Sequence, residues 1–472
     1  MKNRFNRLTS KEWLPFQKSW FRFSGLEKLY EQNLRFFTLP QESPASVFFH
    51  GRQEDRQILE QVARRNGCDI TTDVNPPINF ALIDLLEIVG QETSETDYEK
   101  TKTEVLGLVS KLYHCLDHRR FLAVFVRNVA VGNRFYPYAW DLAKSMAEIL
   151  SLKDEKIGCL DRGTRAQEQN YFTTRQNVIY CLYFRKDEQA AGPQGSHKTG
   201  LFHRTTQEHT SLTFSPLESW YVLKPQPRKK NEILHPAKYP EDLVDLFVQA
   251  FTREQDTVFD PMCGTGSTQL GALRNRRHGY GVELSEFFTQ IAVERCDEFL
   301  APRQEALFAT DRKLRCKILN KDARDINATD FPAIDYMLTS PPYWDMLNMK
   351  GAENQANRKQ KGLQLNYSDD EQDLGNIGDY QGFLTELCTI YFKIIDQLKP
   401  GGYLTIVVKN IKKKGKNYPF AWDLAERLQE KLTLLPEVFW CQDDISIAPY
   451  GYGNTWVSNT FHHYCLNFRK PG

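Results

Sequence analysis

The residues best suited to chemistry are Ser-Pro-Pro-Tyr at positions 340–343. An apolar run at 334–338 precedes them and predicts a short buried strand, which must end here because proline has no N–H to give to a ladder. The two prolines stiffen the backbone, so the Ser340 hydroxyl, the Pro341 carbonyl and the Tyr343 ring are held at fixed angles. Two hydrogen-bond acceptors beside an aromatic ring suit a flat group with an exocyclic amine. Alone, these four residues are as often an ordinary turn, so the interpretation depends on the rest of the chain.

A second candidate site lies between residues 257 and 285, which read as strand, glycine turn, helix and strand. Asp260 ends the first strand. Gly264 and Gly266 then let the backbone turn tightly against a ligand. The helix begins near Ser267, where free N–H groups favour negative charge.

Two more acidic residues follow at predicted strand ends. Glu283 comes 23 residues after Asp260, close to the spacing at which a carboxylate binds the two ribose hydroxyls. Asp322 ends a further strand, where it can accept a hydrogen bond from an adenine amino group. Gln269 replaces the third glycine of the dinucleotide pattern, so we expect a helix packed less closely on its strand, which suits a nucleoside with a carboxylate better than a pyrophosphate. Each acid alone could be a surface carboxylate, but together they predict an adenosine-type site.

Composition bounds the class of protein. A chain of 472 residues is long enough for two or three domains, and a net charge of +1 means that any nucleic-acid surface must be local. Ten cysteines are scattered singly, which argues against a zinc site or a disulfide framework and predicts a reducing, cytoplasmic location. The N-terminus shows no apolar signal region, and no apolar run approaches a membrane span, so we expect no membrane partner.

An internal repeat divides the chain. Asp97–Ala143 and Asp379–Ala425 align without a gap at an offset of 282 and share 16 identities. The repeat also ends alike, with YCLYFRK at 180–186 and YCLNFRK at 464–470. Chance would not give this agreement, so we infer a duplication.

The two copies differ where the chemistry would be. Aligning Ile78 with Ile334 places Asp84 opposite Ser340, and two leucines opposite the two prolines. We interpret the first copy as one that has lost its site. The predicted organisation is a degenerate copy of the catalytic half at 1–187, a linker with a DNA-contact role at 188–230, and a catalytic domain at 231–472, divided into a cofactor half at 231–330 and a target-base half at 331–472.

Taken together, LHPAKYPEDLV, DPMCGTGST, GVELS, NKDA and TSPPYW resemble the amino-methylating DNA methyltransferases, which modify N4 of cytosine or N6 of adenine. The resemblance covers roughly residues 231–470 and, more weakly, 75–186. It implies an α/β, Rossmann-like methyltransferase fold, here with a degenerate partial duplicate of the catalytic half at the N-terminus. It also implies S-adenosyl-L-methionine as cofactor and double-stranded DNA as partner. A serine at the first catalytic position goes mostly with N4-cytosine in this family, so site-specific N4-cytosine methylation is the expected activity.

The resemblance also implies a role for each matching residue. A segment with Pro236 and Pro240 packs over the methionine part of the cofactor, a loop holds its amino-acid end, and carboxylates hold the ribose (Glu283) and the adenine (Asp322). The loop cysteine is a small residue under the turn and not a nucleophile, since cysteine attack serves methylation at ring carbon 5. The implied cofactor-binding residues are His235, Lys238, Asp260, Cys263, Gly264, Gly266, Glu283 and Asp322, the catalytic residues are Ser340, Pro341, Pro342 and Tyr343, and no metal is implied.

The order of parts departs from the family's commonest layout, in which the catalytic half precedes the cofactor half. Here a first copy precedes the cofactor half and a second copy follows it, as a circular permutation arrested at the duplication stage would leave them. This hypothesis predicts that the strand before Ser340, and not the first copy, completes the sheet beside Gly264.

DNA contacts are expected from local basic segments. These are KNIKKKGKNYP at 409–419, a polar insert at roughly 348–378, and the run at 200–230. Trp344 is as well suited to core packing as to stacking on a base that Tyr343 would hold outside the duplex.

Three rival activities stay open at this point. N6-adenine methylation of DNA is the first alternative, methylation of tRNA or rRNA is a less favoured one, and a non-catalytic DNA-binding protein with a relict fold is the third. The sequence leaves open the recognition sequence, the oligomeric state and whether a cognate restriction endonuclease exists.

Overall fold

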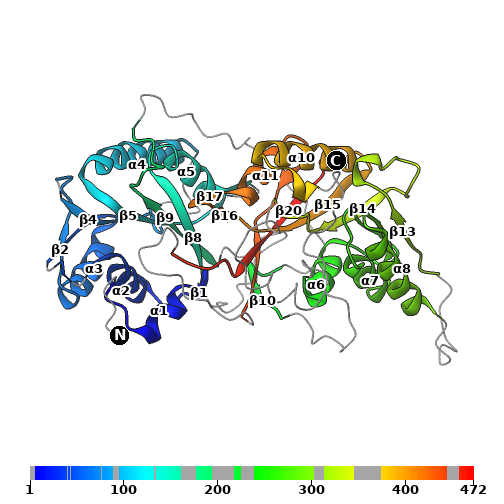
Figure 1. The fold of residues 1–472 in the computed structure, drawn as a ribbon, viewed down its shortest axis with the longest axis horizontal. Coiled ribbons are helices and arrows are strands. Elements are labelled where there is room, and N and C mark those ends of the chain that lie inside the picture. Colours follow the sequence, from blue (N-terminus) through cyan, green and yellow to red (C-terminus); the bar gives the residue numbers. More distant parts are fainter. Residues whose placement is uncertain are drawn as a thin grey trace.

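The computed structural model describes residues 6–39, 41–42, 44–75, 77–88, 95–131, 134–160, 177–193, 217–224, 239–301, 313–344, 374–443 and 457–472. Within these ranges the strands form a seven-stranded sheet in the N-terminal half and a nine-stranded sheet in the C-terminal half. The two sheets lie side by side, each with helices on both faces (Figure 1). Two small hairpins complete the strands: β6 (Val129–Val131) with β7 (Arg134–Tyr136), and β16 (Ile411–Lys413) with β17 (Lys416–Tyr418).

The C-terminal sheet is parallel through its centre, with β20 running antiparallel between β15 and β19. Its apolar strands are buried on both faces, as the strands of a helix-covered parallel sheet must be. In spatial order the strands are β10 (Trp220–Val222), β19 (Val438–Cys441), β20 (His462–Arg469), β15 (Leu398–Val408), β14 (Ile334–Thr339), β11 (Thr257–Asp260), β12 (His278–Glu283) and β13 (Cys316–Asn320), with β18 (Thr433–Leu434) beside β20.

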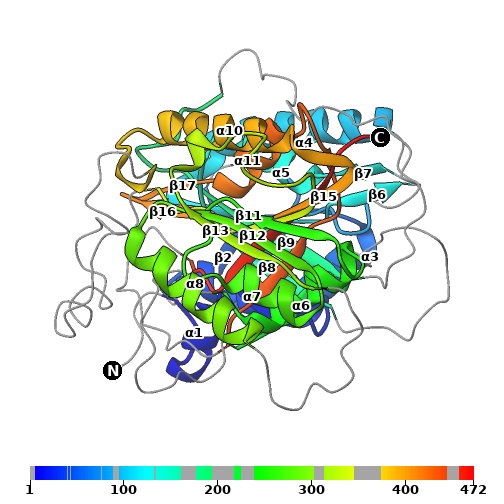
Figure 2. The ribbon, with the colours of Figure 1, turned by 90° about the vertical axis from the view of Figure 1, so that its right-hand side faces the viewer.

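Two layers of helices cover this sheet. Figure 2 shows them on opposite sides of the strands, with α6, α7 and α8 in one layer and α10 and α11 in the other. Helix α6 buries the apolar stripe that its sequence predicts, including Leu243, Phe247 and Phe251. The elements are α6 (Glu241–Phe251), α7 (Ser267–Arg274), α8 (Glu286–Leu300), α10 (Tyr380–Ile395), α11 (Phe420–Leu428) and the short η1 (Ala323–Asp325) and η2 (Leu374–Asn376).

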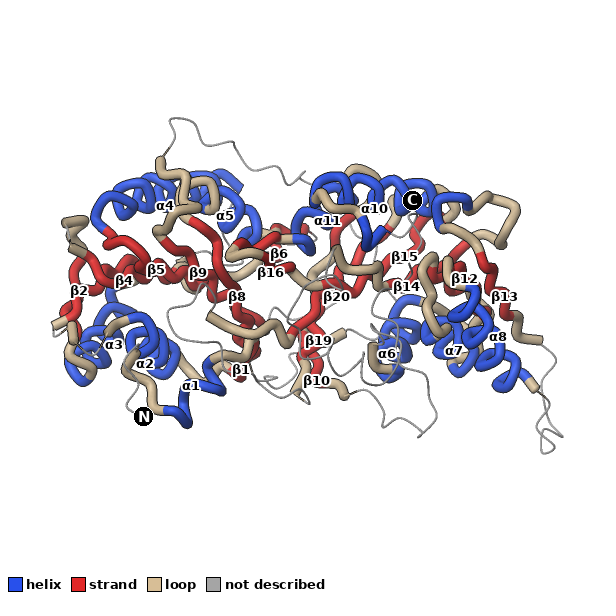
Figure 3. Tube along the Cα trace, viewed as in Figure 1, coloured by secondary structure: helices blue, strands red, loops and turns tan. Residues whose placement is uncertain are grey.

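The N-terminal sheet repeats this strand order. Its strands, in the same spatial sequence, are β1 (Trp20–Arg22), β8 (Ser151–Cys159), β9 (Val178–Arg185), β5 (Leu116–Val126), β4 (Ile78–Asp84), β2 (Ala45–His50) and β3 (Cys68–Thr71). The helices α1 (Ser10–Phe16), α2 (Leu26–Phe37) and α3 (Gln53–Arg65) lie on one side of it, and α4 (Glu95–Cys115) and α5 (Tyr138–Met146) on the other (Figure 3).

This half therefore holds more than the predicted partial copy. Strands β2 and β3 occupy the places that β11 and β12 take in the C-terminal sheet, and a counterpart of β13 is absent from the described ranges. Short apolar strands without a glycine turn look like ordinary core, so nothing in the residue pattern indicated them. Common descent of the two halves, and the permutation, stay predictions.

Strand pairing places β14, the strand before Ser340, where the permutation hypothesis requires it. Strand β14 pairs in parallel with β11, with Val258 opposite Tyr336 and Phe259 opposite Met337. Strand β4 of the first copy belongs to the other sheet. The carboxyl ends of β14 and β11 are thus neighbours within one sheet.

In the described part of the chain, no helix is long and apolar enough to cross a membrane.

Candidate active site

The glycine turn joins β11 to α7 at the carboxyl edge of the sheet. Gly264 and Gly266 have φ values of 51° and 76°, the left-handed region that glycine adopts at little cost. A Cβ on Gly266 would lie 2.9 Å from the Cβ of Ala292 in α8, so only glycine fits at this position. The turn therefore brings bare backbone to the start of α7, where a ligand can approach it.

Glu283 ends β12 and closes this turn from the side. Its two carboxylate oxygens accept hydrogen bonds from the backbone N–H of Gly264 at 2.8 Å and of Ser285 at 3.0 Å. The side chain is half-buried, and an ionised carboxylate has about four lone-pair sites in all. A ribose diol, which offers two adjacent hydroxyl donors, fits this carboxylate.

Asp260 lies beneath the turn and not on its surface. It is buried and accepts hydrogen bonds from the N–H of Met262 (3.0 Å), the Thr268 hydroxyl (2.9 Å) and the Tyr239 hydroxyl (3.4 Å). Burial raises the pKa of its carboxyl from 3.8 to about 6, although hydrogen bonds oppose the shift. Asp260 therefore fixes the shape of the turn, and any effect on a ligand passes through the backbone.

This raised pKa has a measurable consequence for stability. A carboxyl whose pKa is higher in the folded protein contributes stability at low pH, and the contribution is lost as pH rises toward the folded value. Between pH 5 and pH 7.5 we expect the wild type to lose about 1 kcal/mol relative to Asp260→Asn, which does not titrate. Unfolding of the two proteins in urea at both pH values tests this. A difference in stability that does not change with pH would contradict the assignment.

Cys263 and Gln269 complete the support of the turn. Cys263 is buried, its N–H donates to the carbonyl of Val282, and burial raises the pKa of its thiol, which suits a small packing residue. The side chain of Gln269 donates to the carbonyl of Tyr280 at 2.8 Å. The expectation of a loosely packed helix was wrong: a Cβ on Gly279 of β12 would lie 3.1 Å from the Cα of Gln269, so a glycine on the strand allows the close approach.

Asp322 follows β13 and is already paired. Its carboxylate accepts from the backbone N–H of Arg324 and forms an ion pair with the same residue at 2.6 Å. The pKa of Asp322 is lowered, because these bonds outweigh the burial that opposes them. An adenine amino group at this carboxylate would have to share it with the guanidinium.

The segment predicted to be catalytic, residues 340–343, begins where β14 ends. The Ser340 hydroxyl donates to the carbonyl of Val407 on the neighbouring strand β15 at 2.9 Å. Tyr343 is 5% exposed. Trp344 donates to the carbonyl of Ile377 at 2.9 Å and packs against the rings of Tyr380 and Tyr418, so of its two expected uses the structure supports core packing.

Some expected contacts lie elsewhere or cannot be placed. His235, Lys238 and Pro236 lie outside the described residues, as do 201–216 and most of the polar insert. In the basic hairpin β16–β17, Lys412 forms an ion pair with Asp154 of the N-terminal half, and Lys413 lies over the Trp344 ring at 4.0 Å. The charge of Lys412 is therefore engaged between the halves, and the phosphate contact expected of this segment stays a prediction.

The corresponding edge of the N-terminal sheet is built differently. Residues 51–52 join β2 to α3, whereas 261–266 join β11 to α7, so the described edge has no glycine turn of this length. Asp84 occupies the register of Ser340 but is buried, and Tyr30 donates to its carboxylate. Burial raises the pKa of Asp84 to about 6.

Sequence comparison agrees with this geometry. A family model described as DNA methylase, of the type that modifies N6 or N4 amino groups, matches residues 69–294. Over this stretch the chain is similar to that family. The match begins in the first copy, includes the glycine turn and Glu283, and stops before Ser340. It therefore follows the commonest layout, in which the catalytic half precedes the cofactor half. The C-terminal half has a Rossmann-like α/β fold, with a sheet that is parallel through its centre and helices on both faces.

Individual relatives match shorter stretches. The type II methyltransferase M.BglII of Bacillus subtilis is 30% identical over 80 residues, 17% of this chain and 22% of its own length. The type II methyltransferase M.HindIII of Haemophilus influenzae is 29% identical over 99 residues, 21% of this chain and 32% of its own. The chain thus spans less than a third of the length of either relative. A solved structure, an rRNA methylase from Streptococcus thermophilus, matches with a TM-score of 0.29 and 11% identity, over 50% of this chain and 100% of that one.

Proposed function

We propose that the protein is a site-specific DNA methyltransferase that transfers a methyl group from S-adenosylmethionine to the N4 amine of a flipped-out cytosine. The observation that carries the proposal is the pairing of β14 with β11, which brings Ser340 and the glycine turn to one edge of one sheet. Crevices at such edges are where open α/β sheets bind ligands. The ten free cysteines fit action in the cytoplasm.

The cofactor is assigned to the edge formed by β11, β12 and β13. Glu283 would hold the ribose, Asp322 the adenine amino group, and the backbone at Gly264 and Gly266 the amino-acid end, with Asp260 and Cys263 beneath. When bound there, S-adenosylmethionine supplies an electrophilic methyl group on a sulfonium. His235 and Lys238 are assigned to the methionine side by the family motif alone.

The target amine is assigned to Ser340 and Pro341. The N4 nitrogen of cytosine is a poor nucleophile because its lone pair is delocalised into the ring. Since the Ser340 hydroxyl gives its only hydrogen to Val407, its oxygen is left as an acceptor for one N–H of the amine. The Pro341 carbonyl accepts the other N–H, and the two bonds favour a pyramidal nitrogen with a usable lone pair. Positioning and electrostatics then supply most of the rate.

The target base must leave the duplex to reach this edge, at a cost of about a few kcal/mol. Tyr343 is assigned to stack on the extruded base, and Pro341 and Pro342 keep its backbone rigid. Double-stranded DNA is therefore the proposed partner, held by local basic segments and not by the net charge. The proposed domain boundaries are those of the sequence: 1–187, 188–230 and 231–472.

Arg324 gives this assignment a test of its own. If Asp322 binds the adenine amino group, the guanidinium competes for the same oxygens, so Arg324→Ala should lower the Kd for S-adenosylmethionine by up to about fivefold, since a partly exposed ion pair is worth up to about 1 kcal/mol. Isothermal titration calorimetry measures the change. Lys321→Ala, which removes the same charge from a neighbouring pair with Asp330, serves as the control. Weaker binding by Arg324→Ala would show that the arginine helps to hold the cofactor.

Methylation at N6 of adenine is the alternative, because the matching family model covers both amines. Incubation with S-adenosylmethionine and unmethylated genomic DNA, digestion to nucleosides and mass spectrometry separates the two. N4-methylcytosine is the expected product. N6-methyladenine would overturn the inference that Ser340 indicates a cytosine target, and the assignment of the active site would stand. The absence of either base, with cofactor bound and RNA methylated instead, would overturn DNA as the substrate.

A further inference from the structure

The two halves meet through reciprocal contacts between equivalent residues. Trp140 and Trp422, equivalent at the offset of 282, stack with ring centroids 6.4 Å apart. Trp20 of β1 donates to the carbonyl of Gln442, and Trp220 of β10 donates to the carbonyl of Leu160, the residue equivalent to Gln442. Contacts that are exchanged in this way characterise an isologous, twofold interface, here formed within one chain.

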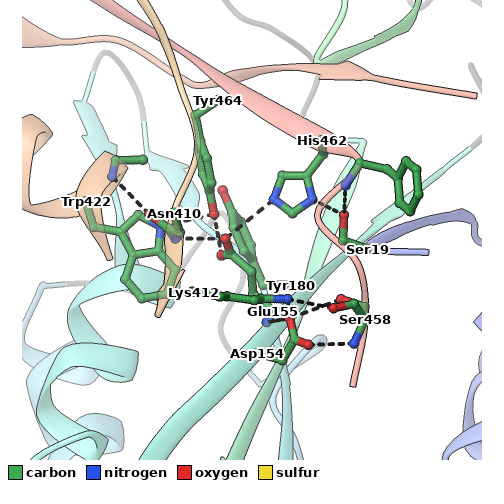
Figure 4. A network of polar contacts seen from close by, with 12 residues as sticks. Ser19, Asp154, Glu155, Tyr180, Asn410, Lys412, Trp422, Ser458, His462 and Tyr464 are labelled. Atoms are coloured by element: carbon green, nitrogen blue, oxygen red, sulfur yellow. Dashed lines mark hydrogen bonds and ion pairs between the residues drawn. The ribbon is translucent and has the colours of Figure 1, made fainter. Parts of the chain in front are cut away.

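Two buried carboxylates are the centre of this interface. Glu155 of the N-terminal half accepts from Asn410 at 2.8 Å and from Tyr464 at 2.5 Å (Figure 4). Its equivalent, Glu437 of the C-terminal half, accepts in the same way from Asn128 (2.8 Å) and Tyr180 (2.6 Å). Each half thus provides the carboxylate that holds the other.

The contact made by Glu155 lies close to the proposed catalytic serine. Asn410 follows the end of β15 by two residues, and Tyr464 is the strand partner of Val408. The side chain of Asn410 also accepts from the N–H of Ala421 at 2.9 Å, which ties the strand end to α11. Val407, whose carbonyl takes the Ser340 hydroxyl, lies in this clamped strand end.

Among the described residues, the N-terminal half makes more polar contacts to the C-terminal half beside Glu155 than the C-terminal half makes in return beside Glu437. Asp154, beside Glu155, accepts from the N–H groups of Val457 (2.8 Å) and Ser458 (2.6 Å) and pairs with Lys412. The residue equivalent to Asp154 is Pro436, which has no carboxylate to offer. The additional charge is therefore directed at the half that carries Ser340.

We propose that Glu155, in the N-terminal half, is a positioning residue for Ser340 in the C-terminal half. Glu155 fixes Asn410 and Tyr464, these fix the end of β15, and the Val407 carbonyl at that end orients the Ser340 hydroxyl. Glu437 does the same for β5, whose neighbour β4 ends at Asp84 and has no glycine turn beside it. The inference rests on the proposed function, and it gives the N-terminal half a role in catalysis without a site of its own.

The test compares Glu155→Ala with Glu437→Ala in the full-length protein. Both remove one buried carboxylate that is bonded to an asparagine and a tyrosine of the other half, so both should lower the Tm, Glu155→Ala somewhat more because Glu155 also lies 3.5 Å from His462 Nε2. Only Glu155→Ala should lower kcat, by about 10-fold to 100-fold, as a misplaced reacting group does, with an unchanged Kd for S-adenosylmethionine. Glu155→Gln, whose amide oxygen can still accept from Asn410, should recover most of the rate. Glu437→Ala, although it lies in the proposed catalytic half, should leave kcat unchanged.

Equal losses of kcat in the two alanine variants would overturn the inference and leave the proposed function standing. A wild-type protein that methylates neither DNA nor RNA would overturn the proposed function instead. Should an alanine variant fail to fold, Tyr464→Phe and Tyr180→Phe form a milder pair that removes one bond from each carboxylate. Amide hydrogen exchange adds a readout without activity: exchange across 405–411 should quicken in Tyr464→Phe and not in Tyr180→Phe, and equal exchange would contradict the inference.

Discussion

Ser340→Ala is expected to lower kcat for DNA methylation by about 100-fold to 1,000-fold while S-adenosylmethionine binds as before, the loss typical of one missing acceptor or donor at a reacting centre. The hydroxyl lies at the end of β14 and its hydrogen is given to Val407, so it serves as an acceptor and takes no part in holding the cofactor. Tyr343→Ala should likewise lose activity and keep cofactor binding. Single-turnover methylation and calorimetry measure the two quantities separately.

The N-terminal half offers a matched control for this prediction. Asp84 occupies the register of Ser340 in the other sheet, where it is bonded by Tyr30. Asp84→Asn keeps the size of the side chain and should leave the rate of methylation unchanged. Full methylation by Ser340→Ala, or a loss of activity in Asp84→Asn without a loss of stability, would show that the reaction does not take place at the end of β14.

Glu283→Ala is expected to raise the Kd for S-adenosylmethionine by about 100-fold, because two hydrogen bonds to a charged group, at roughly 1.5 kcal/mol each, are lost. The same change frees the N–H of Gly264, so the turn itself also loses its lateral support. Calorimetric titration measures the Kd, and activity at saturating cofactor shows whether the later steps survive.

Glu286→Ala is the control for Glu283→Ala. It removes the same charge three residues further on, from an exposed position in the first turn of α8. Its Kd should stay within about twofold of the wild type, since no described contact ties it to the turn. If the two variants bound the cofactor equally well, the ribose would have to lie away from β12.

The local parts of the site could be predicted from the sequence. The glycine turn, the acids at strand ends and the Ser-Pro-Pro-Tyr segment are each short and constrained by backbone chemistry, so their places at one sheet edge followed from the order of strands. The position of β14 beside β11 followed from the same reasoning. None of this required knowledge of contacts between distant residues.

What could not be predicted depends on such distant contacts. Nothing in the local sequence indicates that the Ser340 hydroxyl would find the carbonyl of Val407, 67 residues further on. The repeat predicted similar halves but not that Glu155 and Glu437 would hold each other's strands, since a buried acid in a strand looks unfavourable until its partners are known. Helix α7 lacks the third glycine of the dinucleotide pattern, and a glycine on β12 takes over its role in close packing. The motif alone does not reveal this.

A crystal structure of the protein with S-adenosylhomocysteine tests most directly that the C-terminal sheet holds the active site. The account predicts one ligand per chain at the carboxyl ends of β11, β12 and β13, with its ribose hydroxyls on the carboxylate of Glu283 and its sulfur toward Ser340. A ligand bound at the ends of β2 and β4 in the N-terminal half, or a ribose that leaves Glu283 untouched, would contradict it.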